Sequence, residues 1–265
     1  MKRRREDTER PAKRAGKIRL LDIGISCMTE GQLMEEVLAG TEEPGQASLI
    51  FLNTDVMMKA DSDAYLKQVI RKAKWVVADG MPLIWISKLY GTPLPEKISG
   101  SDFVPKLCEE CVRRGKSLYF AGGAPGVAKR AAARLRKRYP GIRIKGCYSP
   151  PYGFEKQPEE VEKMNRAIRE AGPDILIVCL GCPKQETYIF ENQDRYQVPV
   201  SICAGATIDF LAGRVKRCPA WMSRCGLEWF YRFLQEPGRL FRRYFIDDIQ
   251  ILRLIIRYRP GRRGR

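Results

Sequence analysis

The chain of 265 residues contains no histidine. Without an imidazole there is no Ser-His-Asp triad, no Cys-His pair, no histidine general base and no histidine-containing zinc site. Any acid–base chemistry is therefore left to the side chains of Asp, Glu, Cys, Lys and Tyr.

Long apolar runs are missing as well. No stretch of about 18 or more consecutive apolar residues occurs, and the first residues lack the apolar core of a signal peptide. We therefore expect a protein that stays in the cytoplasm. Its nine cysteines fit reduced, buried thiols better than a disulfide framework. The pairs Cys108/Cys111 and Cys179/Cys182 lack the tight loops of zinc knuckles, so we predict no metal and no cofactor.

The net charge of +17 is concentrated at the two ends of the chain. Residues 1–19 hold nine basic and three acidic side chains, and residues 213–265 hold fourteen and four, which together account for +16 and leave +1 for residues 20–212. Basic ends of this kind seek anionic partners, either phospholipid headgroups or nucleic acid. The basicity therefore belongs to the ends and not to the fold.

The fold class follows from β-like segments that alternate with helical ones. We predict a hairpin or strand over 18–25, further strands over 47–53, 75–78, 117–120, 142–147, 173–181 and 199–204, and helices over 29–39, 56–71, 159–171 and 244–258. This alternation is typical of a Rossmann-like α/β fold with a mainly parallel sheet flanked by helices. We predict three parts: a disordered basic leader (1–17), a catalytic domain (18–212) and a basic helical appendage (213–265).

Polar residues follow several of these strands. Asp79 ends the strand 75–78, where it is a candidate catalytic residue and equally a candidate helix cap. Asn53 and Asp55 follow another strand, Gly122-Gly123 opens a turn suited to a phosphate, and 181–186 follows a third strand. The motif Asp61-Ser62-Asp63 falls inside the predicted helix 56–71, so we interpret it as exposed helix surface and not as a metal site.

The C-terminal segment mixes aromatic residues with arginines. In the predicted helix 244–258, four apolar residues fall on one face: Phe245, Ile249, Leu252 and Ile256. This stripe suits a membrane interface or packing on the core, and the surplus arginines favour the membrane. A nucleic-acid-binding protein is the alternative from another class, but a phosphate backbone has no use for an aliphatic stripe.

A family resemblance rests on a series of motifs in one order: Asn53-Thr54-Asp55, Ala78-Asp79-Gly80-Met81-Pro82-Leu83, Ser99-Gly100-Ser101-Asp102, Gly122-Gly123-Ala124-Pro125-Gly126-Val127-Ala128, Pro173-Asp174-Ile175-Leu176, Gly181 with Pro183-Lys184-Gln185-Glu186, Gly205-Ala206, Cys218-Pro219-Ala220-Trp221-Met222, Gly226-Leu227-Glu228-Trp229 and Glu236-Pro237. Over residues 18–245 the chain resembles the WecG/TagA/CpsF family of bacterial glycosyltransferases.

The resemblance implies an inverting, metal-independent transferase. Its donor would be a UDP-sugar, foremost UDP-N-acetylmannosamine, and its acceptor a polyprenyl-diphosphate-linked saccharide at the inner face of the membrane, in teichoic-acid or surface-polysaccharide biosynthesis. UDP-glucose or UDP-glucuronate is the alternative donor. The basic C-terminal tail would bind the anionic membrane surface. We predict no nucleic-acid partner. The sequence leaves open whether the protein forms a homo-oligomer.

The resemblance also implies roles for individual residues. Asp79 would act as the general base on the acceptor hydroxyl. Lys97 stands where relatives often have Arg. A lysine offers a phosphate a single point charge, whereas an arginine can bind it through two parallel hydrogen bonds. Cys218 stands where an Ala is common. The residues expected to bind substrate are Asn53, Asp55, Gly80, Lys97, Gly122, Gly123, Lys184, Gln185, Glu186, Asp209, Arg214 and Arg217.

Overall fold

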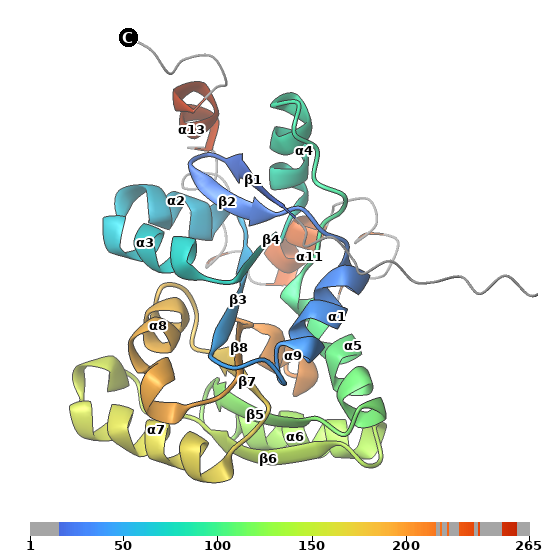
Figure 1. Ribbon diagram of the computed structural model, residues 1–265, viewed down its shortest axis with the longest axis vertical. Helices are drawn as coiled ribbons and strands as arrows, with labels where there is room; N and C mark the ends of the chain where they lie inside the picture. Colours follow the sequence, from blue (N-terminus) through green and yellow to red (C-terminus); the bar gives the residue numbers. More distant parts are fainter. Residues whose placement is uncertain are drawn as a thin grey trace, which may run out of the picture.

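A computed structural model of the chain describes residues 16–215, 218, 222, 228–235, 238 and 251–258. Its centre is a six-stranded parallel sheet with the strand order β4-β3-β8-β7-β5-β6. The strands are β3 (Ala47–Leu52), β4 (Trp75–Ala78), β5 (Ser117–Gly122), β6 (Arg143–Tyr148), β7 (Ile175–Cys179) and β8 (Val200–Cys203). The predicted Rossmann-like α/β class is confirmed (Figure 1).

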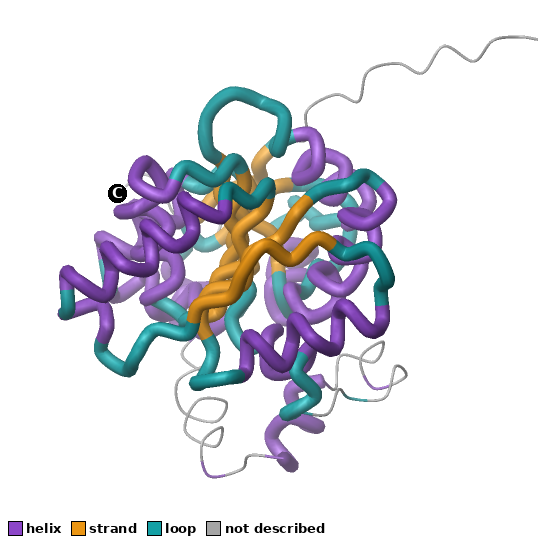
Figure 2. The backbone as a smooth tube through the Cα atoms, turned by 90° about the horizontal axis from the view of Figure 1, so that it is seen from below, coloured by secondary structure: helices purple, strands orange, loops and turns teal. Residues whose placement is uncertain are grey.

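Helices cover both faces of the sheet (Figure 2). One face packs against α1 (Glu30–Ala39), α5 (Gly100–Arg113), α6 (Val127–Arg138) and α9 (Thr207–Leu211). The other packs against α2 (Thr54–Ser62), α3 (Ala64–Lys72), α4 (Met81–Leu89), α7 (Pro158–Ala171), α8 (Lys184–Tyr196) and α13 (Ile251–Arg257), with the short helix η1 (Phe154–Lys156) beside α7. A strand buried on both faces must be apolar throughout, which is why the central strands read as continuous hydrophobic runs. The helix α11 (Glu228–Gln235) is also described.

The chain enters the fold through an antiparallel hairpin of β1 (Lys17–Leu20) and β2 (Ile23–Ser26). Its two-residue turn, Leu21 and Asp22, has positive φ at both positions, as a tight hairpin between twisted strands requires. The hairpin therefore confirms the prediction over 18–25, although β1 begins at Lys17, inside the predicted leader. Residues 1–15 of that leader lie outside the described residues.

The predicted start of α1 is confirmed. The hydroxyl of Thr29 accepts a hydrogen bond from the backbone of Gln32, and the Gln32 side chain accepts from the Thr29 N–H in return. This reciprocal pair is a capping box, in which each side chain satisfies an otherwise unpaired donor of the first turn.

The prediction of one helix over 56–71 is wrong, because the chain breaks there into α2 and α3. Asp63 adopts an extended conformation at the junction, and its carboxylate accepts hydrogen bonds from the N–H groups of Tyr65 and Leu66. A carboxylate at this position caps the new helix and so stabilises the break. Asp61, expected on exposed helix surface, is mostly buried, with 16% of its side chain exposed.

Asp79 is not the N-cap residue of the helix that follows it. Gly80 occupies that position with φ of 138°, a conformation that residues with a side chain rarely adopt. The alternative interpretation of Asp79 as the cap of this helix is therefore wrong.

The predicted stripe at the C-terminus faces outward. In α13 it is Ile251 and Leu254 that pack into the core, whereas the stripe residues Leu252 and Ile256 are exposed. Residues 244–250 of the predicted helix lie outside the described residues, and with them Phe245 and Ile249. Among the described helices, none has the length and apolar character needed to cross a bilayer.

Candidate active site

The site is built at the carboxyl edge of the sheet, where β3 and β4 end side by side. Leu52 and Ala78 are register partners, and the N–H of Asp79 extends the ladder by donating to the Leu52 carbonyl at 2.7 Å. Asn53 and Asp79 are therefore the first residues beyond two paired strand ends. In open α/β sheets this edge is where ligands bind.

Asn53 has a structural role at this edge. Its Oδ1 accepts a hydrogen bond from the Val56 N–H at 3.1 Å and so caps α2. Such a cap fixes the orientation of the side chain and uses its carbonyl oxygen. Among the hydrogen bonds of the described residues, the Nδ2 amide of Asn53 donates to no protein acceptor. The capped side chain thus still has two N–H bonds to offer a ligand.

Lys97 reaches the same edge from the loop that precedes α5. The N–H of Ile98 donates to the Ala78 carbonyl at 2.9 Å, so this loop runs directly beside the end of β4. The Lys97 ammonium lies 3.9 Å from Asp102, and only 18% of its side chain is exposed. Asp102 also accepts a hydrogen bond from the Ser99 hydroxyl at 2.7 Å. Lys97 is therefore a largely buried cation in a loop that runs beside the strand end that carries Asp79.

The glycine pair at the end of β5 packs closely against the neighbouring strand β7. A Cβ at Gly122 would lie 2.3 Å from the backbone oxygen of Cys179 on β7, and φ of 112° also requires glycine. The N–H of Gly123 donates to the same oxygen at 2.9 Å. This amide is therefore already engaged, and the role of Gly122 and Gly123 at a diphosphate stays a prediction that needs other donors of the turn.

Gln185 and Glu186 form a buried bridge between strand ends. The amide oxygen of Gln185 accepts from the Gly205 N–H at 3.0 Å, and its Nε2 donates to Glu186 Oε1 at 2.8 Å. Burial raises the pKa of the Glu186 carboxyl, and among the described residues its Oε2 has no hydrogen-bond partner. Both functional groups of Gln185 are thus in use, which favours a positioning role over direct contact with a diphosphate.

Two predicted charged residues, Lys184 and Asp55, form ion pairs within the protein. Lys184 forms an ion pair with Glu155 at 2.6 Å, and this hydrogen bond lowers the pKa of the Glu155 carboxyl. Asp55 pairs with Lys59 at 3.0 Å, and Lys59 also donates to the Cys182 carbonyl at 3.3 Å. The sequence offered a signal for Lys59, because it lies one helical turn from Asp55.

The last predicted contacts lie around α9. Arg214 approaches Asp209 at 3.6 Å, so these two predicted residues are close together. Arg217 lies outside the described residues.

The structure therefore brings the predicted residues together in groups along one edge of the sheet. Asp79, Asn53 and Lys97 gather at β3 and β4, while Gln185, Glu186, Gly122 and Gly123 gather around β7, β8 and β5. Asp102 was missed as a partner of Lys97, although the motif Ser99-Gly100-Ser101-Asp102 contained the signal. Chemically, a carboxylate directly after one strand can take up a proton, and a lysine from the loop beside that strand end can stabilise a developing anion.

The fold and this edge define an open, parallel α/β protein of the kind that binds its ligand beyond the carboxyl ends of the strands. The chain belongs to the glycosyl transferase WecG/TagA/CpsF family, whose model matches residues 18–265, and it is a glycosyltransferase.

Two relatives share one name. The chain is 32% identical over 193 residues to the N-acetylglucosaminyldiphosphoundecaprenol N-acetyl-beta-D-mannosaminyltransferase of Bacillus spizizenii, which covers 73% of each chain. It is 30% identical over 188 residues to the Bacillus subtilis enzyme of that name, which covers 71% of each chain. Membership in this family favours the enzyme over the nucleic-acid-binding alternative.

Proposed function

We propose that the protein transfers N-acetylmannosamine from its UDP-sugar to a polyprenyl-diphosphate-linked saccharide, in teichoic-acid or surface-polysaccharide biosynthesis. The name that both relatives carry supports this substrate pair. The observation that carries the proposal is the joint position of Asp79 and Lys97 at the end of β4. UDP-glucose or UDP-glucuronate is the alternative donor. The enzyme works at the cytoplasmic face of the membrane as a peripheral protein.

The reaction is a single displacement that inverts the anomeric carbon. An acceptor hydroxyl attacks that carbon while its proton passes to the Asp79 carboxylate. The bond from the anomeric carbon to the UDP oxygen breaks, and the electron pair leaves on the diphosphate. The Lys97 ammonium stabilises this charge, so the chain's own cations do the work that a metal does in other transferases.

The neighbouring residues hold the donor. The Nδ2 amide of Asn53 offers two donors to the sugar or the base, and its cap on α2 fixes their direction. Asp209 on α9 contacts the nucleotide, and Arg214, which follows that helix and lies close to Asp209, contacts the lipid diphosphate. Gln185 acts by holding Gly205 and Glu186 in place.

The test is release of UDP from a panel of UDP-sugars in the presence of a short-chain polyprenyl-diphosphate-linked N-acetylglucosamine. We expect UDP release with UDP-N-acetylmannosamine that depends on the acceptor and persists with EDTA. Release with UDP-glucose or UDP-glucuronate instead would move the protein to the alternative donor class. No acceptor-dependent release from any UDP-sugar would contradict the proposal.

A further inference from the structure

Exposed apolar side chains gather on α4 and α13. Of the eight large apolar side chains exposed among the described residues, four lie on these two helices: Trp85 (57%), Leu89 (71%), Leu252 (57%) and Ile256 (62%). Single exposed apolar residues are common, but a group of this kind marks an interaction site. We call these four residues the α4–α13 surface.

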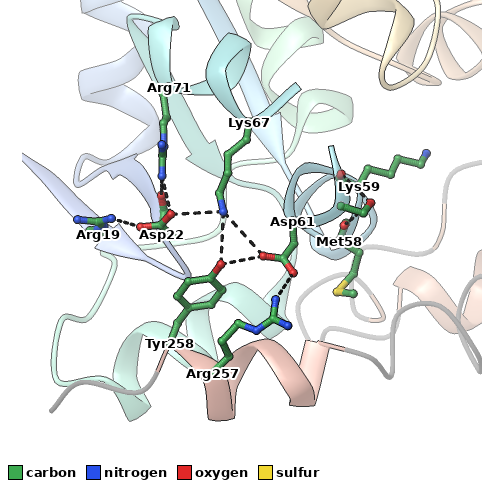
Figure 3. Close-up of polar contacts among 10 residues, drawn as sticks. Arg19, Asp22, Met58, Lys59, Asp61, Lys67, Arg71, Arg257 and Tyr258 are labelled. Atoms are coloured by element: carbon green, nitrogen blue, oxygen red, sulfur yellow. Dashed lines mark hydrogen bonds and ion pairs between the residues drawn. The ribbon is translucent and has the colours of Figure 1, made fainter. Parts of the chain in front are cut away.

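A polar network fixes α13 on the side that faces α2 and α3 (Figure 3). Asp61, at the end of α2, accepts hydrogen bonds from the Arg257 guanidinium at 3.0 Å and from the Tyr258 hydroxyl at 2.8 Å. Lys67 of α3 lies 3.8 Å from Asp61 and 3.3 Å from Asp22 of the hairpin. Asp61 and Lys67 thus contact the end of the C-terminal helix directly, and Lys67 links this contact to Asp22 of the hairpin.

On its other flank α13 contacts α4. The Tyr90 hydroxyl, directly after α4, donates to the Ile255 carbonyl at 2.8 Å. Ile251 and Leu254 pack in the same core cluster as the buried residues of α4. Leu252 and Ile256 are one turn apart and lie on the solvent side of α13, opposite the buried Ile251 and Leu254, while Arg257 bonds to Asp61. In Figure 1 both helices stand at the same end of the molecule.

The charged residues of α4 and α13 themselves are all basic, and of these Arg257 is paired with Asp61. Neither α4 nor α13 contains an acidic residue, and the two helices carry three exposed cations, Lys88, Arg253 and Arg257. The sequence after Tyr258 adds four arginines and no acid. Apolar side chains surrounded by cations match an anionic lipid surface, where the acyl region takes the former and the headgroups the latter.

We propose that the α4–α13 surface docks on an anionic phospholipid bilayer, so that α4 inserts Trp85 and Leu89 beside Leu252 and Ile256 of the C-terminal helix. An indole at such a position suits the interface between headgroups and acyl chains. The inference rests on the proposed function, because a lipid-linked acceptor must meet the site at the membrane. It adds α4, a helix of the catalytic domain, to the membrane contact that the sequence analysis assigned to the C-terminal tail alone.

The docking surface also connects to the chemistry. Asp79 lies two residues before α4, and a helix of nine residues is about 13 Å long. Insertion of α4 would therefore fix the depth of the base relative to the bilayer. The diphosphate of the acceptor lies at that boundary, because its polyprenyl chain stays in the lipid.

The experiment measures how the full-length protein partitions onto vesicles. The vesicles contain equal parts phosphatidylcholine and phosphatidylglycerol, and pure phosphatidylcholine vesicles serve as the charge control. The variants are Trp85→Ser/Leu89→Ser on α4 and Leu252→Ser/Ile256→Ser on α13. Tyr65→Ser is the matched control, because Tyr65 is an exposed aromatic residue on α3 that faces α8 and bonds to Glu191. Trp85→Phe/Leu89→Ile tests for rescue.

We expect each serine pair to weaken partition by at least about tenfold, since two apolar side chains leave the lipid. Tyr65→Ser and the rescue variant should partition like the wild type. Wild-type partition by Trp85→Ser/Leu89→Ser would overturn the inference, as would a serine pair that instead dissociates an oligomer in the absence of lipid. Transfer to a soluble short-chain acceptor should stay unchanged in the α4 variant. If no variant and no wild type transfers sugar, the proposed function fails while the partition result stands.

Discussion

Replacement of Gln185 by Ala tests whether this residue positions its neighbours or binds the diphosphate directly. The change deletes two hydrogen bonds, from the Gly205 N–H and to Glu186, in a side chain that is only 6% exposed. A lost hydrogen bond costs about 1 kcal/mol, and a buried acceptor left without its partner costs about 1–3 kcal/mol. We therefore expect a loss of about 2–4 kcal/mol in the free energy of unfolding, or about 4–16 °C in Tm for a chain of this size.

The same variant should change how stability depends on pH. Burial raises the pKa of the Glu186 carboxyl, so the native state binds a proton that the unfolded state releases, and stability falls as pH rises through that window. The hydrogen bond from Gln185 lowers this pKa, so its loss raises the pKa further and extends the window upward. The deficit of the variant should therefore be larger at about pH 8 than at about pH 5.

The assay is thermal unfolding at both pH values, with and without UDP. Gln193→Ala is the matched control, because Gln193 lies on the same helix and forms its hydrogen bonds through its backbone carbonyl. A Gln185→Ala protein with wild-type Tm at both pH values and weaker UDP binding would refute this reasoning and make Gln185 a direct ligand of the diphosphate.

The other predictions concern the sheet edge and the C-terminal helix. Gly122→Ala should lower the free energy of unfolding by more than about 3 kcal/mol, because the new Cβ meets the Cys179 backbone oxygen. Gly153→Ala, with positive φ but open space, should cost only about 1–2 kcal/mol, and equal costs in urea unfolding would contradict the steric argument. Glu186→Gln should flatten the pH dependence of Tm, and an unchanged slope would assign it to another group. Asp61→Ala should speed proteolysis of the C-terminal helix without lowering the Tm of the protein, and wild-type cleavage rates would show that the hydrogen bonds from Arg257 and Tyr258 to Asp61 do not hold this helix.

Those features of the fold that depend on local sequence could be predicted. The parallel sheet followed from strands that are apolar throughout, and the start of α1 followed from Thr29 and Gln32. The break at Asp63 was missed because residues 56–71 contain no Gly or Pro to mark it, so that only the capping carboxylate distinguishes two helices from one.

Features that depend on distant segments could not be predicted. The sequence marked Gly122 as a phosphate turn, but the need for glycine there comes from the Cys179 carbonyl on the neighbouring strand. Likewise, periodicity placed Leu252 and Ile256 on one face of a helix without indicating whether that face is inside. The structure answers this, because Ile251 and Leu254 occupy the core and leave the stripe exposed.

The central claim is that Asp79 accepts the proton of the acceptor hydroxyl. The most direct measurement is acceptor-dependent UDP release by Asp79→Asn, which keeps the shape of the side chain and removes its basicity, with UDP-sugar binding measured in parallel. We predict a fall of about 10²–10⁴-fold in kcat with binding largely unchanged. Full activity of Asp79→Asn would contradict the account.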